Sequence, residues 1–125
     1  MAAPTRDDAQ LVVQLAGVGA QLELGKANSF IWSEEFIAHY AEFKKEFPPG
    51  SKELGRVNTL AGWYETVATL VKHGLLHEEL VQDWLAIGMT WKRLEPILLG
   101  MREESGEPRL YENFEALAAR VPVPA

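Results

Sequence analysis

The strongest amphipathic pattern in the chain covers residues 51–73 and predicts one long helix. At about 100° per residue, the apolar side chains of this stretch share one arc, and most polar side chains lie opposite. The apolar arc holds Leu54, Val57, Leu60, Trp63, Tyr64, Val67, Ala68, Leu70 and Val71. Ser51 is a suitable N-cap, and Gly74 stands where a left-handed residue ends many helices.

A first helix is predicted over residues 5–26. Thr5 and Asp8 have the spacing of a capping box, which favours a helix start at this point. The polar stripe of this helix is narrow and consists of Gln10, Gln14 and Gln21. Most of the remaining surface is apolar, so the helix is either central in the fold or shared with a partner.

A second helix is predicted between these two, with Ser33 as its N-cap and Phe47 near its end. Two acidic residues follow Ser33 and would interact favourably with the helix dipole. The residues 48–50, Pro-Pro-Gly, cannot continue a helix and form the clearest break in the chain.

A fourth helix is predicted from His77, with a break or kink between Gly88 and Pro96. Proline in a helix interior loses a hydrogen bond and clashes with the preceding turn. A second segment then continues to about Glu104, and a last helix lies within residues 106–121. No strand pattern competes, so the predicted fold is a single all-α domain over residues 1–125, a compact bundle of about five helices.

Composition narrows the classes of function. The chain has 125 residues, a formal net charge of −6 and no cysteine. The absence of cysteine excludes disulfides, iron–sulfur clusters and thiol catalysis, and it fits a cytoplasmic location. An acidic chain is a poor ligand for nucleic acids, and its small basic clusters, Lys44–Lys45 and Lys92–Arg93, fit solvated helix faces. The glutamines interrupt the apolar run of the first helix before it reaches the roughly 20 residues of a membrane span, so no membrane contact is expected.

One group of charged residues and tryptophans could form a binding site. Arg56 lies on the apolar arc of its helix, and Arg102 projects near Trp84 if that helix is continuous. The full set is Arg56, Glu65, Asp83 and Arg102 together with Trp63, Trp84 and Trp91. A guanidinium on an apolar face needs an acidic partner or an aromatic plane. We favour a structural arginine–carboxylate pair, and the alternative is a pocket that binds a carboxylate or phosphate between aromatic walls.

Other catalytic and metal patterns are missing. His73 and His77 are four residues apart, but Gly74 lies between them and should end the helix, so a shared metal ion is not predicted. The chain contains neither a nucleophile elbow nor a glycine-rich phosphate loop. We therefore predict no catalytic residue, no metal ligand, no cofactor and no enzymatic activity.

Several short segments between Leu54 and Ala118 are similar to those of a known family. They are Arg56-Val57, Trp63 to Val67, Leu70 to Leu76, the residues Trp91, Leu94, Pro96 and Arg102, and Tyr111 to Leu117. This stretch resembles a family of small bacterial and archaeal helical domains of uncharacterised function. Members often carry an N-terminal hydrophobic segment that anchors them in a membrane. The first helix of this chain differs from such a segment because a stripe of glutamines interrupts it. The resemblance implies an all-α core over residues 51–121 and assigns no reaction.

The predicted function follows from the first helix. A helix that is apolar on most sides suggests contact with another chain. The sequence therefore predicts a non-enzymatic interaction or regulatory domain that forms a homodimer through residues 5–26. The alternative is a domain that binds a small anion through arginines and aromatic side chains between helices.

Overall fold

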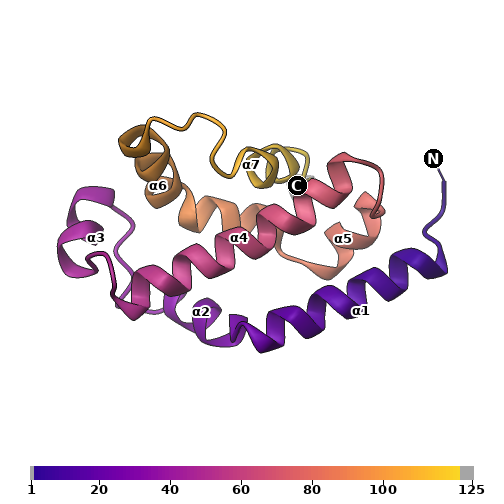
Figure 1. Cartoon of the computed structure of the whole chain (residues 1–125), viewed down its shortest axis with the longest axis horizontal. Helices are drawn as coiled ribbons and strands as arrows, with labels where there is room; N and C mark the ends of the chain where they lie inside the picture. The colour runs from indigo at the N-terminus through magenta and orange to yellow at the C-terminus, as the bar shows by residue number, and fades with distance from the viewer. Residues whose placement is uncertain (1, 122–125) are drawn as a thin grey trace.

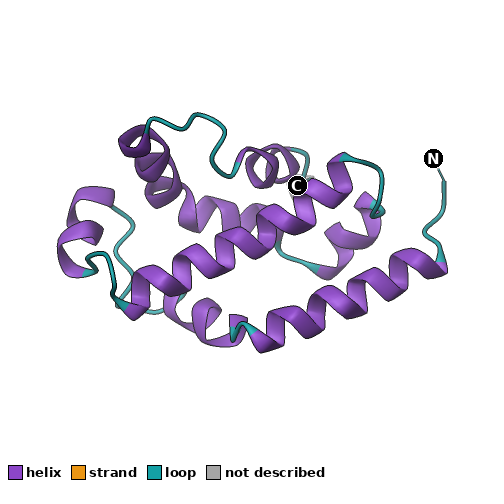
Figure 2. Cartoon of the chain, viewed as in Figure 1, coloured by secondary structure: helices purple, strands orange, loops and turns teal. Residues whose placement is uncertain are grey.

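The computed structural model describes residues 2–121, and every regular element within that range is an α-helix (Figures 1 and 2). The elements are α1 (Arg6–Gln21), α2 (Leu24–Ile31), α3 (Tyr40–Glu46), α4 (Lys52–Lys72), α5 (Glu78–Trp84), α6 (Ile87–Ser105) and α7 (Glu112–Ala119). The all-α prediction is therefore confirmed, whereas the predicted number of about five helices is wrong, because this part of the chain contains seven.

The long helix α4 forms the centre of the molecule. It packs against α2 on one side and against α7 on another, while α6 contacts both α3 and α7 (Figure 1). Its predicted ends are confirmed, since Ser51 Oγ accepts a hydrogen bond from the Leu54 amide and Gly74 has a φ of 70°. The apolar arc faces the core, where Val57, Leu60 and Val67 are fully buried.

The predicted first helix is two helices, because the chain turns sharply at Glu23. The capping box of Thr5 and Asp8 is present at the start of α1, but α1 ends at Gln21 and Glu23 adopts a left-handed φ of 59°. A left-handed conformation costs about 1–2 kcal/mol for a residue other than glycine. The turn offsets this cost because it buries Leu24, Ala27, Phe30 and Ile31 of α2, most of whose contacts are with α4.

The predicted second helix starts later than expected. α3 begins at Tyr40, with His39 as its N-cap. Ser33 does not cap it: Ser33 Oγ donates to the Phe30 carbonyl at 2.7 Å and accepts from the Glu35 amide at 3.3 Å. Its hydroxyl therefore closes a turn after α2, which is a common role of serine outside helices. The predicted break at 48–50 is confirmed by the end of α3 at Glu46.

The predicted break between Gly88 and Pro96 is wrong. The chain breaks earlier, between the end of α5 at Trp84 and the start of α6 at Ile87, and α6 continues through Pro96. Pro96 is exposed, so water can reach the backbone carbonyl that the proline leaves without a donor. Burial of Leu94, Ile97 and Leu98 beside the proline holds the helix together.

Candidate functional site

Arg102, one of the two predicted arginines, is bound within the protein. Its Nε and Nη2 donate to the Leu110 carbonyl at 3.1 and 2.8 Å, and its Nη1 donates to Glu115 Oε1 at 2.9 Å. These bonds join the end of α6 to α7 and to the segment before it. The expected approach to Trp84 required a continuous helix, and the break between α5 and α6 removes that condition.

Glu65, which lies on α4, caps the first turn of α7. From α4, its Oε1 accepts a hydrogen bond from the Phe114 amide at 2.8 Å, in the first turn of α7. Tyr111, at the N-cap of α7, has a φ of 58° and gives no side-chain cap of its own. Asn113 extends the contact by donating to Thr69 Oγ1 at 3.1 Å. Glu65 therefore fixes the start of α7 against α4.

Replacing Glu65 by alanine is expected to lower the free energy of unfolding by about 1–2 kcal/mol, because α7 loses the acceptor for one amide of its first turn. Glu65→Gln should lose less, since its amide oxygen can still accept the bond. Asp83→Asn is the control, because Asp83 is exposed and has no bonded partner within residues 2–121. Urea unfolding measures all three variants, and equal stabilities of Glu65→Ala and the wild type would contradict this role.

The three tryptophans of the predicted cluster belong to the core of the fold. Trp63 contacts Trp84 edge to face with ring centroids 5.5 Å apart, and Trp63 Nε1 donates to the Leu15 carbonyl at 3.0 Å. Trp91 lies elsewhere, against Phe114 at 5.1 Å. The structure therefore brings Trp63 and Trp84 together, and it does not gather all seven predicted residues in one place.

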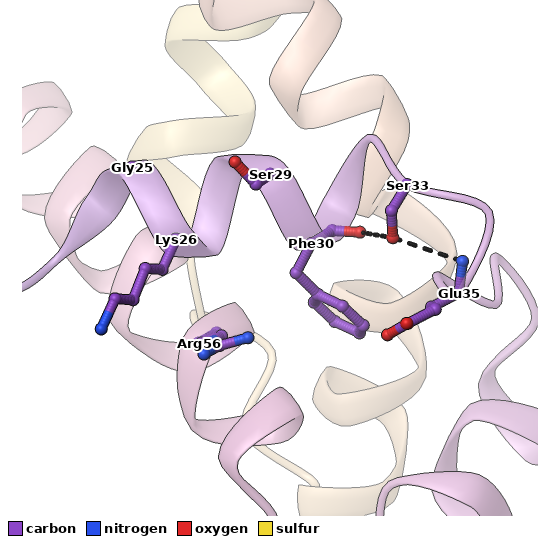
Figure 3. Close-up of a pocket in the computed structure, with 7 residues that line it drawn as sticks. All are labelled: Gly25, Lys26, Ser29, Phe30, Ser33, Glu35 and Arg56. Carbon is purple, nitrogen blue, oxygen red and sulfur yellow. Dashed lines mark hydrogen bonds between the residues drawn. The ribbon is translucent and has the colours of Figure 1, made fainter.

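Arg56, the second predicted arginine, lines a pocket of about 480 Å³ (Figure 3). The other lining residues are Gly25, Lys26, Ser29 and Phe30 of α2, and Ser33 and Glu35 of the turn after α2. Arg56 is half-buried and has no hydrogen bond or ion pair to any of residues 2–121. The two predicted arginines thus differ, because Arg102 is satisfied internally and Arg56 faces a cavity.

Arg93 is a structurally important residue that the sequence did not reveal. Instead of lying on a solvated face, it is half-buried and donates to the Ile31 carbonyl at 2.5 Å and to the Ser33 carbonyl at 3.3 Å. Its guanidinium also lies 4.8 Å from the centroid of the Phe36 ring. No local pattern indicates this role, because the acceptors belong to a helix end that was not predicted.

Two tyrosine side chains packed in or against the core have shifted pKa values. Burial raises the pKa of Tyr64 and of Tyr111, so both phenols stay protonated at neutral pH. His77 caps α5, where its Nδ1 accepts from the Leu80 amide at 3.3 Å. Within residues 2–121, histidine, aspartate and glutamate side chains do not gather in a group of three or more that could hold a metal ion.

The outer face of α1, formed by Ala9, Val13, Ala16, Gly17 and Ala20, is exposed along its whole length. Val13 is 71% exposed, and a Cβ placed on Gly17 would meet no atom within 4 Å. Only Leu15 and Gly19 of α1 are buried. No helix within the described range is both long and apolar enough to cross a bilayer.

These features define a small all-helical domain in which two of the four predicted polar residues, Glu65 and Arg102, hold helices together. The chain belongs to a family described as a domain of unknown function (DUF4760), whose model matches residues 5–121. The expectation of a family without an assigned function is therefore confirmed, and the match includes α1. Neither a curated protein nor a solved structure matches the chain.

Proposed function

We propose that this chain is a non-enzymatic interaction domain that associates with a second copy of itself through the outer face of α1. The observation that supports this proposal is an exposed helix surface without charge. Residues 9–22 contain no aspartate, glutamate, lysine or arginine, although 24% of all residues in the chain are charged. Exposed faces of helices in single-chain proteins usually carry charged side chains, so this face is suited to burial against another surface.

The shape of this face is complementary to itself. Val13 protrudes, and Gly17, one turn later on the same face, leaves a gap. A twofold axis crossing α1 between these residues would pair two antiparallel helices, with each Val13 placed over Gly17 of the second copy. Small residues on either side allow the backbones to approach closely. Because the face is uncharged, two chains with a net charge of −6 would meet there without opposing like charges.

The substitution Gly17→Ala should have opposite effects on the stability of the single chain and on its self-association. The added methyl group meets nothing within 4 Å in one chain, and alanine favours the helix by about 1 kcal/mol over glycine, so thermal stability should rise. In the proposed dimer the same methyl group fills the gap for Val13. We therefore expect the dissociation constant from sedimentation equilibrium to increase at least about tenfold.

The matched control is Gly55→Ala in α4, which also has open space at its Cβ and should gain helix stability without changing association. A wild-type chain that remains monomeric at high micromolar concentration would contradict the proposal. So would a Gly17→Ala variant whose association equals that of Gly55→Ala.

A further inference from the structure

The pocket beside Arg56 contains a guanidinium that the protein leaves without a partner. Three arginines of the described chain are half-buried, and two of them, Arg93 and Arg102, donate to backbone carbonyls. Arg56 makes no such bond within residues 2–121, although it is held beside the fully buried Val57. A guanidinium has five N–H donors, and the nitrogens of Arg56 are not among the buried atoms that lack a partner in the described chain, so water can reach them. A ligand that brings a carboxylate could replace this water and accept hydrogen bonds from Arg56.

Glu35 supplies an opposite charge to the same pocket. Its amide donates to Ser33 Oγ at 3.3 Å, which fixes the turn that carries it (Figure 3). Its carboxylate forms no ion pair with Arg56, nor with any other cation of residues 2–121. Lys26, the remaining charged residue of the lining, pairs with Glu23 at 3.2 Å. Two unpaired charges of opposite sign, the half-buried Arg56 and the exposed Glu35, therefore line one open pocket.

The arrangement of these charges selects the class of ligand. A simple anion would be attracted by Arg56 and by the exposed Lys26 and repelled by Glu35, whereas a simple cation would be attracted by Glu35 alone. A molecule with both a carboxylate and an ammonium group would be attracted by both side chains.

Phe30 adds an apolar wall between the two charges, as Figure 3 shows. Its ring is held by edge-to-face contacts with Phe36 at 5.7 Å and Phe47 at 5.3 Å. This wall can cover the methylene groups that join the two charged ends of such a ligand.

We propose that the pocket between α2 and α4 binds a small zwitterion of the amino-acid type. Its carboxylate accepts hydrogen bonds from Arg56, its ammonium donates to Glu35, and its carbon chain lies on Phe30. The volume of about 480 Å³ accommodates a molecule of this size. This site is independent of the association through α1, because none of its lining residues lies on that helix.

Titration of the full chain followed by amide NMR shifts tests the ligand class. The probes are glycine, 4-aminobutyrate and 6-aminohexanoate, with butyrate, butylamine and inorganic phosphate for comparison. We expect at least one zwitterion to bind about tenfold more tightly than butyrate or butylamine, because only it engages both charges. The shifted amides should include those of Gly25 and Ser29. Equal or tighter binding of butyrate or phosphate, or no shift at these amides, would overturn the proposal.

Variants of the two charged residues test the binding mode. Arg56→Gln should weaken zwitterion and butyrate binding alike, whereas Glu35→Gln should remove only the preference for the zwitterion over butyrate. Lys52→Gln and Glu34→Gln are the controls, since both side chains are exposed and neither lines the pocket. Losses no larger than those of the controls would refute the assignment.

Gly25→Val provides a test that does not change charge. A Cβ at Gly25 meets no atom within 4 Å, so the fold should tolerate the larger side chain while the pocket becomes smaller. We expect the melting temperature to stay close to that of the wild type and zwitterion binding to be lost. Binding that survives in this folded variant would place the ligand elsewhere.

Discussion

Replacing Arg93 by methionine is expected to lower the free energy of unfolding by about 3 kcal/mol, because two carbonyls at the end of α2 lose a charged donor. Those carbonyls belong to Ile31 and Ser33, and the Ile31 side chain is fully buried. The guanidinium also neutralises the negative end of the helix dipole of α2. Its contacts with the Phe36 and Trp32 rings, at 4.8 and 5.5 Å, add a smaller cation–π contribution.

Two further variants test whether Arg93 stabilises the fold through its hydrogen-bond geometry or through its charge alone. Arg93→Lys keeps the charge but cannot place two donors in a plane, so it should recover only part of the lost stability. Lys92→Met is the matched control, because Lys92 is its exposed neighbour and should change stability by less than about 0.5 kcal/mol. Chemical denaturation measures all three variants. Full recovery by Arg93→Lys would show that charge alone accounts for the effect.

Gly100→Ala is expected to destabilise the protein by about 2 kcal/mol, even though alanine normally favours a helix over glycine. A Cβ at Gly100 would lie 2.2 Å from Cγ and 2.7 Å from Cβ of Tyr40. The ring cannot turn away easily, because Tyr40 Oη donates to Glu104 Oε1 at 3.1 Å and Lys44 pairs with the same carboxylate. The substitution should therefore displace α3 from α6.

A double-mutant cycle tests this explanation. In a Tyr40→Ala background the obstacle is gone, so Gly100→Ala should become neutral or stabilising. Gly62→Ala in the middle of α4 is the control, since its Cβ meets nothing within 4 Å and should stabilise the fold by up to about 1 kcal/mol. Thermal unfolding of the four chains gives the coupling energy. A destabilising effect of Gly100→Ala that persists without Tyr40 would place its cause elsewhere.

The elements that were predicted correctly are those whose signals are local. The boundaries of α4 follow from a serine cap, a terminal glycine and one amphipathic face, all within about twenty residues. The capping box at Thr5 is equally local. In each case the interacting groups are neighbours along the chain, so their pairing needs no knowledge of the rest of the fold.

The incorrect boundaries depend on distant contacts. The break at Glu23 occurs because α2 gains burial against α4. After this turn, Leu24 and Trp63 lie against Gly19, where an added Cβ would come within 2.9 Å of Leu24 and 3.5 Å of Trp63. The continuity of α6 through Pro96 likewise depends on the core that Leu94 and Ile97 join. Local propensity predicted the opposite in both places, and tertiary burial outweighed it.

Local patterns in the chain predict the all-helical class, the long central helix and the presence of arginines on apolar faces. The partners of those arginines depend on how the helices pack. Arg56 and Arg102 look alike in the sequence, yet Arg102 finds the Leu110 carbonyl and Glu115 while Arg56 faces a pocket. This difference arises because the helix period fixes the side of the helix on which a charged side chain lies, whereas its partners come from segments that only folding brings near.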